Sequence, residues 1–136
     1  MKSTVIDKYL ARYAEPEARD VPATSSVWRH VVCIPACDEA DNLLCTLQGL
    51  CKARQAESSL VVVVVNGREA APAEVHASNA KTLAQLRAAC GASPGVQAWG
   101  DLQGMGVLVV DRATQDRWLP RKQGVGLARK IAGDIA

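Results

Sequence analysis

Short apolar runs alternate with longer amphipathic stretches along most of this chain. Residues 31–34, 60–65 and 107–110 are apolar without alternation, which is typical of strands that are buried on both faces. The second run holds five consecutive valines, and such a β-branched run does not favour a helix. Residues 96–99 mark a further candidate short strand, and Pro35 is expected to end the first one.

Apolar positions recur at helical spacing outside these runs. The spacing predicts helices over residues 3–14, 38–55 and 74–90, and from about residue 121 to the end. The apolar face of the 38–55 helix consists of Leu43, Leu44, Leu47, Leu50 and Cys51. Its expected first turn holds Asp38, Glu39 and Asp41, where the helix dipole favours acids.

The order of these elements predicts an α/β fold, namely a Rossmann-like parallel sheet with alternating strands and helices. Residues 1–26 are interpreted as an N-terminal helix and linker, and residues 27–136 as the α/β domain. In a sheet ordered third, second, first, the first strand would lie at an edge. Because the last helix carries no stop signal, we expect a truncated domain in which a strand beyond residue 136 would cover that edge.

Composition is that of one globular domain, with 136 residues, 49% hydrophobic and 22% charged. A net charge of +2 without a basic block argues against a nucleic-acid partner. The six-residue run at 60–65 is far shorter than the roughly 20 residues that cross a bilayer, so no transmembrane segment is expected. The N-terminus does not have the pattern of a signal peptide, which favours a cytoplasmic location.

Cysteine and histidine spacing does not favour a metal site. The five cysteines form no Cys-x-x-Cys pair, and His30 and His76 do not stand at ligand spacing. We therefore expect reduced thiols that serve as small buried side chains, and no metal ligands.

Ligands of parallel α/β sheets bind beyond the carboxyl ends of the strands. Three segments are expected there, residues 35–39, 66–68 and 111–122. Asp38 and Glu39 could accept hydrogen bonds from ribose hydroxyls or a base N–H, and Asn66 could both donate and accept. Lys122 and Arg129, at the expected start of the last helix, would attract phosphates.

Three motifs in these segments resemble family-two glycosyltransferases, which have the GT-A fold. Residues 35–39, Pro-Ala-Cys-Asp-Glu, stand where the family has Pro-Ala-x-Asn-Glu, and Thr46-Leu47 matches its Thr-Leu pair. Residues 66–68, Asn-Gly-Arg, replace Asp-Asp-Gly-Ser, so the acid that commonly faces the base is absent. Residues 124–129 match the Gly-x-Gly-x-Ala-Arg helix start.

The resemblance implies transfer of a sugar from a nucleotide-diphosphate sugar to an acceptor hydroxyl. It implies that the nucleotide-binding residues of this chain are Pro35, Ala36, Asp38, Glu39, Asn66, Lys122 and Arg129. The catalytic carboxylates and the ligands of a divalent metal (Mg or Mn) would follow residue 136. The full-length protein is thus expected to be an enzyme, and the 136-residue chain alone to be inactive.

Structural alternatives exist for each motif. The acids at 38, 39 and 41 could cap a helix, Asn66-Gly67 could be a plain turn, and the basic residues of the last helix could form a solvated face. For the whole chain the alternatives are a non-catalytic nucleotide-binding or interaction module, or a different small α/β enzyme. The sugar, the base, the acceptor and the oligomeric state stay open.

Overall fold

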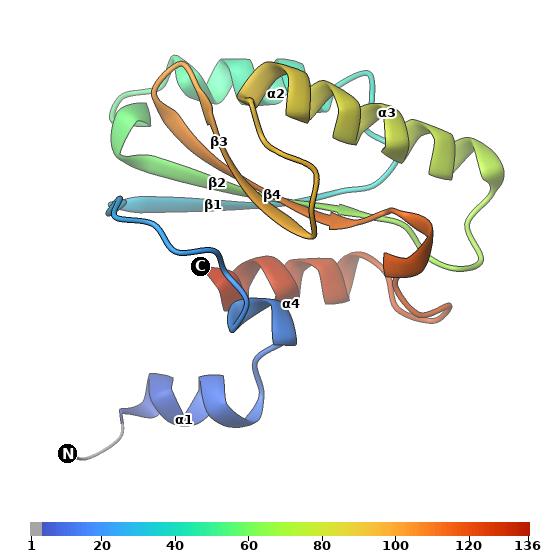
Figure 1. The fold of residues 1–136 in the computed structure, drawn as a ribbon, viewed down its shortest axis with the longest axis horizontal. Coiled ribbons are helices and arrows are strands. Elements are labelled where there is room, and N and C mark those ends of the chain that lie inside the picture. Colours follow the sequence, from blue (N-terminus) through green and yellow to red (C-terminus); the bar gives the residue numbers. More distant parts are fainter. Residues whose placement is uncertain (1–3) are drawn as a thin grey trace.

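The computed structural model describes residues 4–136, which form an open α/β sheet with helices on both faces (Figure 1). The strands are β1 (His30–Ala36), β2 (Ser59–Asn66), β3 (Gln97–Leu102) and β4 (Met105–Arg112). The helices are α1 (Val5–Arg12), α2 (Leu43–Cys51), α3 (Ala73–Cys90) and α4 (Val125–Ile135). Short 3₁₀ turns occur at η1 (Pro16–Ala18), η2 (Ala56–Ser58) and η3 (Gln115–Arg117). No helix in residues 4–136 is long and apolar enough to cross a membrane.

The sheet has the strand order β1-β2-β4-β3. β1, β2 and β4 are parallel, which confirms the mostly parallel α/β fold, and β1 lies at an edge. The prediction of an entirely parallel sheet is wrong at β3, which pairs antiparallel with β4. Gln103 and Gly104 join these two strands with φ values of 52° and 89°. Two successive positive φ angles suit a tight hairpin turn, and Gln at the first position made that turn hard to foresee.

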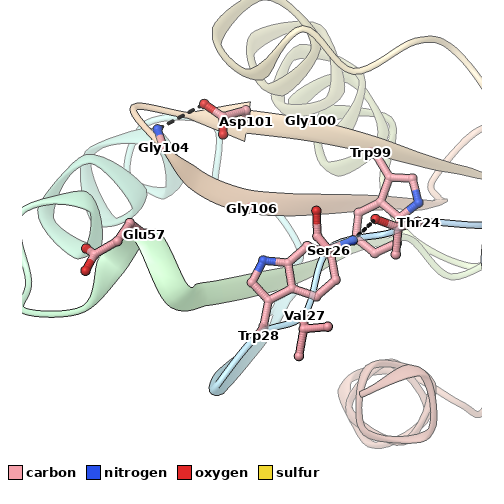
Figure 2. Close-up of a pocket in the computed structure, with 10 residues that line it drawn as sticks. All are labelled: Thr24, Ser26, Val27, Trp28, Glu57, Trp99, Gly100, Asp101, Gly104 and Gly106. Carbon is pink, nitrogen blue, oxygen red and sulfur yellow. Dashed lines mark hydrogen bonds between the residues drawn. The ribbon is translucent and has the colours of Figure 1, made fainter.

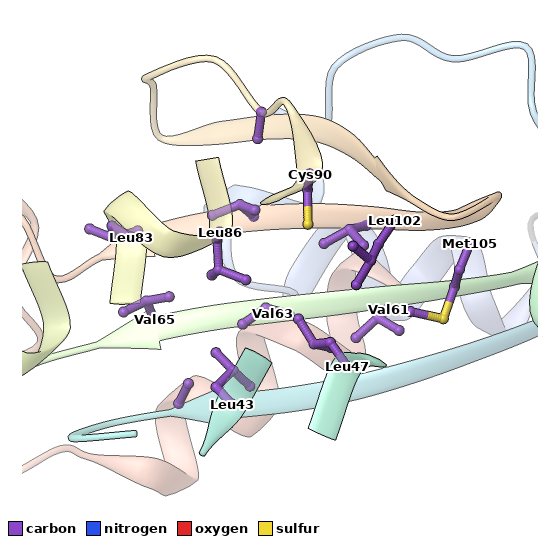
Figure 3. Packing of buried hydrophobic residues seen from close by; sticks show 14 of the residues in the cluster. Leu43, Leu47, Val61, Val63, Val65, Leu83, Leu86, Cys90, Leu102 and Met105 are labelled. Atoms are coloured by element: carbon purple, nitrogen blue, oxygen red, sulfur yellow. The ribbon is translucent and has the colours of Figure 1, made fainter. Parts of the chain in front are cut away.

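Alternate side chains of β2 and β4 pack against different helices. Val61, Val63 and Val65 point into a cluster under α2 and α3, together with Leu47 and Leu86 (Figure 3). Leu60, Val62 and Val64 point to the other face, where Ala128, Ile131 and Ala132 of α4 cover them. The expected buried strand at 60–65 and the expected apolar face of α3 are thus confirmed. The expected face of α2 is confirmed except for Leu44, which does not belong to the cluster. β2 is therefore covered by apolar clusters on both faces of the sheet.

The first strand differs from its prediction in two respects. It continues through Pro35 to Ala36, and Val31 and Val32 are 38% and 36% exposed. A proline is tolerated there because an edge strand can direct that position away from the ladder. The same edge position leaves the apolar side chains incompletely covered, so burial on both faces was the wrong interpretation of this run.

Two predicted helices begin later than expected. α2 starts at Leu43, because Asp38 adopts a left-handed conformation with φ 57° that a helix cannot include. α4 starts at Val125, because residues 120–123 form a turn in which Gln123 N donates to Pro120 O at 2.9 Å. Lys122 therefore precedes the helix, and Arg129 lies in its second turn. Both corrections move charged residues out of a helix and into the connections.

The segment before β1 contacts the sheet at several points. Glu17 is buried and pairs with Arg112 at 2.9 Å, and Trp99 Nε1 donates to Pro22 O at 2.9 Å. α1 has no buried residue, and Tyr9 Oη donates to Asp134 of α4 at 2.7 Å. The segment between α1 and β1 is therefore anchored to the strands, while α1 contacts α4 through polar groups.

Alanine at two glycines is expected to have opposite effects on stability. A Cβ at Gly100 would lie 2.8 Å from the carbonyl oxygen of Cys90, so Gly100→Ala should lower the free energy of unfolding by about 1–3 kcal/mol. Gly49 of α2 has no atom within 4 Å of such a Cβ, so Gly49→Ala should raise it by about 0.5–1 kcal/mol. Urea unfolding followed by circular dichroism measures both. Equal effects of the two substitutions would contradict the close packing of α3 on β3.

Candidate functional site

The carboxyl ends of β1 and β2 and the amino end of α4 border an open cavity of about 470 Å³. It lies at the edge of the sheet where parallel α/β proteins bind ligands. Its lining consists of Cys37, Asn66, Arg68, Gly124, Val125 and Gly126. Two of the three predicted segments, residues 35–39 and 66–68, contribute to this lining, whereas residues 111–122 do not. This cavity is the candidate site.

The amino end of α4 supplies unused hydrogen-bond donors to the cavity. The first hydrogen bond of the helix runs from Ala128 N to Gly124 O at 3.1 Å, and no side chain caps this end. The N–H groups of Val125, Gly126 and Leu127 therefore have no partner within the helix. Gly126 has no atom within 4 Å of where a Cβ would stand, so a ligand can approach the backbone closely. This end of the helix suits an anion.

Arg68 adds a positive charge to the same place. A Cβ at Gly124 would lie 3.3 Å from Cδ of Arg68, so the arginine side chain extends across the start of α4. Residues 4–136 contribute no acidic side chain to the lining of this cavity. Arg68 was absent from the predicted site residues, although its place directly after Asn66-Gly67 could have indicated it. A guanidinium beside free backbone N–H groups strengthens the preference for an anion.

Asn66 lies in the cavity wall and is structural. It is 3% exposed, and in the amide orientation that suits its neighbours Nδ2 donates to Ala36 O at 3.2 Å and Val64 O at 3.1 Å. These bonds join the carboxyl ends of β1 and β2. Its amide N–H groups are therefore not free to recognise a base, and Ala36, itself 1% exposed, is a packing residue.

Asn79 of α3, which the sequence reasoning missed, joins the two loops of the site. Its fully buried side chain accepts from Asp38 N at 2.9 Å and donates to Asn66 O at 3.0 Å. The bond to Asp38 accompanies the left-handed backbone at that residue. Only a polar residue among the apolar positions of an Ala-rich helix could have signalled this role. Asn79 fixes where the loop after β1 lies relative to the end of β2.

The other predicted residues do not line the cavity. Asp38 and Glu39 are exposed on the loop after β1, and Pro35 is half-buried in the strand. Lys122 and Arg129 are exposed as well, and neither contributes to the lining. The structure therefore brings Asn66, Arg68 and the start of α4 together at the cavity. The two acids and the two predicted cations lie outside its lining.

A buried carboxylate organises the loop after β4. Asp111 is 0% exposed, and its carboxylate accepts hydrogen bonds from Ala113 N and Thr114 N, both at 2.9 Å. Two arginines form ion pairs with its Oδ2: Arg117 Nη1 lies 2.9 Å away and Arg87 Nη2 3.6 Å away. Burial raises the pKa of Asp111, but the hydrogen bonds from Thr114 and Ala113 and the charge of Arg117 outweigh it, so the pKa lies below its usual value. Asp111 thus stays ionised and holds the loop that leads toward α4.

An aromatic pair closes the space behind Gly67. The rings of Trp118 and His76 stack with centroids 4.1 Å apart, and Trp118 Nε1 donates to Ala113 O at 2.9 Å. A Cβ at Gly67 would lie 3.2 Å from Nδ2 of Asn79 and 3.3 Å from Nδ1 of His76, so a side chain there would press on both residues. The ring nitrogens of His76 are buried and have no hydrogen-bond partner among residues 4–136. Stacking on Trp118 is the contact that holds this ring.

A second cavity, of about 490 Å³, lies at the amino ends of the parallel strands and beside the carboxyl half of β3 (Figure 2). Trp28 and Trp99 stack there with ring centroids 5.1 Å apart and pack against the cluster beneath α4. Asp101 accepts from Gly104 N at 3.0 Å and so serves the hairpin turn. The described part of its lining includes Glu57 and Asp101 and no basic residue, which disfavours a phosphate. It is therefore the weaker candidate.

Metal and thiol chemistry have little support at the site. Among residues 4–136 no three His, Cys, Asp or Glu side chains gather as metal ligands, and all five cysteines are free. The expectation of buried thiols is wrong for Cys33, Cys37 and Cys45, which are exposed. Burial raises the pKa of the Cys37 thiol, although a hydrogen bond to Asn79 and the charge of Arg68 act in the opposite direction. A protonated thiol is a poor nucleophile.

Asp111→Asn should destabilise the protein in a pH-dependent manner. Because the folded-state pKa of Asp111 is lowered, its contribution is complete above the pKa of the unfolded chain, roughly 4, and is lost as the pH falls through the folded-state pKa. At pH 7 the variant should lose about 3 kcal/mol, since two arginines lose their buried partner. Urea unfolding between pH 3 and pH 7, with the exposed Asp116→Asn as matched control, measures this. A loss at pH 7 no larger than that of the control would contradict it.

No known protein family, curated protein or solved structure significantly matches this chain.

Proposed function

We propose that this chain binds the diphosphate of a nucleotide at the amino end of α4, as the nucleotide-binding part of a glycosyltransferase that uses a nucleotide sugar. The observation that carries the proposal is the uncapped start of α4, which opens on a cavity beside Arg68. Three free N–H groups, the helix dipole and a guanidinium all favour the same anionic ligand.

Location and size support the same ligand class. The cavity lies beyond the carboxyl ends of β1 and β2, the place where doubly wound sheets hold nucleotides. Its volume of about 470 Å³ falls within the range of small-molecule sites. A ligand as long as a nucleoside diphosphate would extend past the lining toward the exposed loop after β1.

The loop after β1 offers acceptors for the ribose. Asp38 and Glu39 are exposed there, and the bond between Asp38 N and Asn79 positions the loop. Carboxylates can accept hydrogen bonds from hydroxyl groups. Since the NH2 group of Asn66 is occupied, hydrogen-bond donors to the base would come from backbone groups.

Sugar transfer itself is proposed for a protein in which further residues supply the ligands of a divalent cation and a general base. Such a cation would neutralise the diphosphate and assist the leaving group. A non-catalytic nucleotide-binding module is the second candidate, favoured by the buried, structural Asn66 where the resembling family has an acid. Nucleotide binding without sugar transfer by any longer form of the chain would favour that module.

Arg68→Gln should weaken nucleotide binding without unfolding the protein. The substitution removes the charge beside the start of α4 and keeps most of the side-chain length. We expect the dissociation constant for UDP, GDP or ADP, whichever binds best, to rise about tenfold in isothermal titration calorimetry. Arg121→Gln, an exposed arginine outside the cavity lining, is the matched control and should leave it unchanged. Equal affinity of both variants and the wild type would refute the anion site.

Glu39→Gln tests the ribose contact separately. Its side chain is exposed, so the melting temperature should not change. If the carboxylate accepts a hydrogen bond from the ribose, the affinity for the nucleotide should fall several-fold, while that for inorganic pyrophosphate, which has no ribose, should stay the same. Titration of wild type and variant with both ligands measures the difference. An unchanged nucleotide affinity would remove Glu39 from the site.

A further inference from the structure

β1 presents an apolar and unpaired edge of the sheet (Figure 1). It pairs with β2 along one side over seven residues, so the N–H and C=O groups of its other side have no strand partner in residues 4–136. Val31 and Val32 are 38% and 36% exposed, and Cys33 is exposed as well. This combination favours pairing with another strand.

The edge has few of the features that prevent an edge strand from pairing with a strand of another molecule. Natural edge strands are protected by lysines, bulges, prolines or covering loops. From His30 to Ile34 the strand carries no lysine, arginine or acid, and its register with β2 is uninterrupted. Pro35, next to the last residue of the strand, is the one protective residue. Most of the edge is therefore open to a partner.

Charges at the two ends of β1 have opposite sign. Arg29 precedes the strand, and Arg54 borders a cavity with His30 and Val32. Asp38 and Glu39 follow the other end, and all four charged side chains are exposed. Glu57 and Arg68 are not counted among the charges at the ends of β1. Glu57 lines the cavity that contains Trp28, and Arg68 extends across Gly124. An antiparallel copy of this edge would bring each basic end near an acidic one.

We infer that β1 pairs antiparallel with β1 of a second copy of this chain, about a two-fold axis near the middle of the strand. Two four-stranded sheets would thus form one continuous sheet of eight strands. Two-fold symmetry is the commonest way to close such an interface, and antiparallel pairing follows from it. Parallel pairing would place like charges together at both ends. The inference does not rest on the proposed nucleotide site, although Asp38 and Glu39 take part in both proposals.

The surface beside the edge can accept the partner's side chains. A cavity of about 280 Å³ lies between the amino half of β1 and the end of α2. Val32, Leu50, Val61 and Met105 contribute its apolar lining. Apolar side chains of the partner's β1 that point to this face would cover that opening, which adds hydrophobic contact to the backbone hydrogen bonds.

Val31→Lys tests the pairing at the strand. We expect sedimentation equilibrium of the wild type to show a dimer whose dissociation constant is about 100 µM or lower. Val31→Lys should be a monomer with an unchanged circular dichroism spectrum, because a lysine at the edge opposes a second strand. Val27→Lys, 90% exposed and outside the strand, is the matched control and should remain a dimer. A wild type that is monomeric throughout, or a dimer that survives Val31→Lys, would overturn the inference.

A charge swap tests the orientation without altering the strand. Arg29→Glu and Glu39→Arg should each weaken the dimer, because each creates like-charge contacts at both ends of the pair. The double variant restores opposite charges in the antiparallel arrangement and should recover most of the association. Failure of the double variant to recover, with both single variants folded and weakened, would overturn the antiparallel arrangement.

Discussion

Burial of β2 on both faces is the constraint on which the rest of the structure depends. Its side chains from Leu60 to Val65 are at most 5% exposed, and the valines are completely covered. A strand of this kind needs a strand on either side and a helix layer on each face. β1 and β4 provide the first, and α2, α3 and α4 the second. Polar chemistry is therefore confined to the ends of the strands.

At the carboxyl ends, buried polar side chains replace apolar packing as the organising contacts. Asn66 joins the ends of β1 and β2, Asn79 joins α3 to both loops, and Asp111 holds the loop after β4. These groups are satisfied by hydrogen bonds within the protein, which explains why they can be buried. Their effect is to bring Arg68 and the open end of α4 to one cavity. The proposed ligand contacts are thus exposed groups positioned by buried ones.

Much of this arrangement could be predicted from apolar pattern alone. The valine run identified β2, and the spacing of Leu83 and Leu86 identified α3, because burial selects one periodicity strongly. The edge exposure of β1 and the late starts of α2 and α4 could not be predicted. The start of α2 depends on the left-handed backbone of Asp38, and the start of α4 on the turn at residues 120–123. The exposure of β1 depends on its position at the edge of the sheet, which is set by the tertiary structure. Within the site, Asn66 was predicted and does line the cavity, where its NH2 group also joins the strand ends. Arg68 and Asn79 were missed because their roles depend on distant partners.

The most direct measurement of the central claim is a titration of the isotope-labelled protein with a nucleoside diphosphate, followed by amide chemical shifts. Binding at the open end of α4 predicts the largest shifts at the backbone amides of Val125, Gly126 and Leu127, with smaller ones at Cys37 and Arg68. Amides beside Trp28 and Trp99, at the other end of the strands, should not move. Shifts concentrated at those tryptophans, or none at millimolar nucleotide, roughly the weakest affinity worth considering for such a site, would contradict the account.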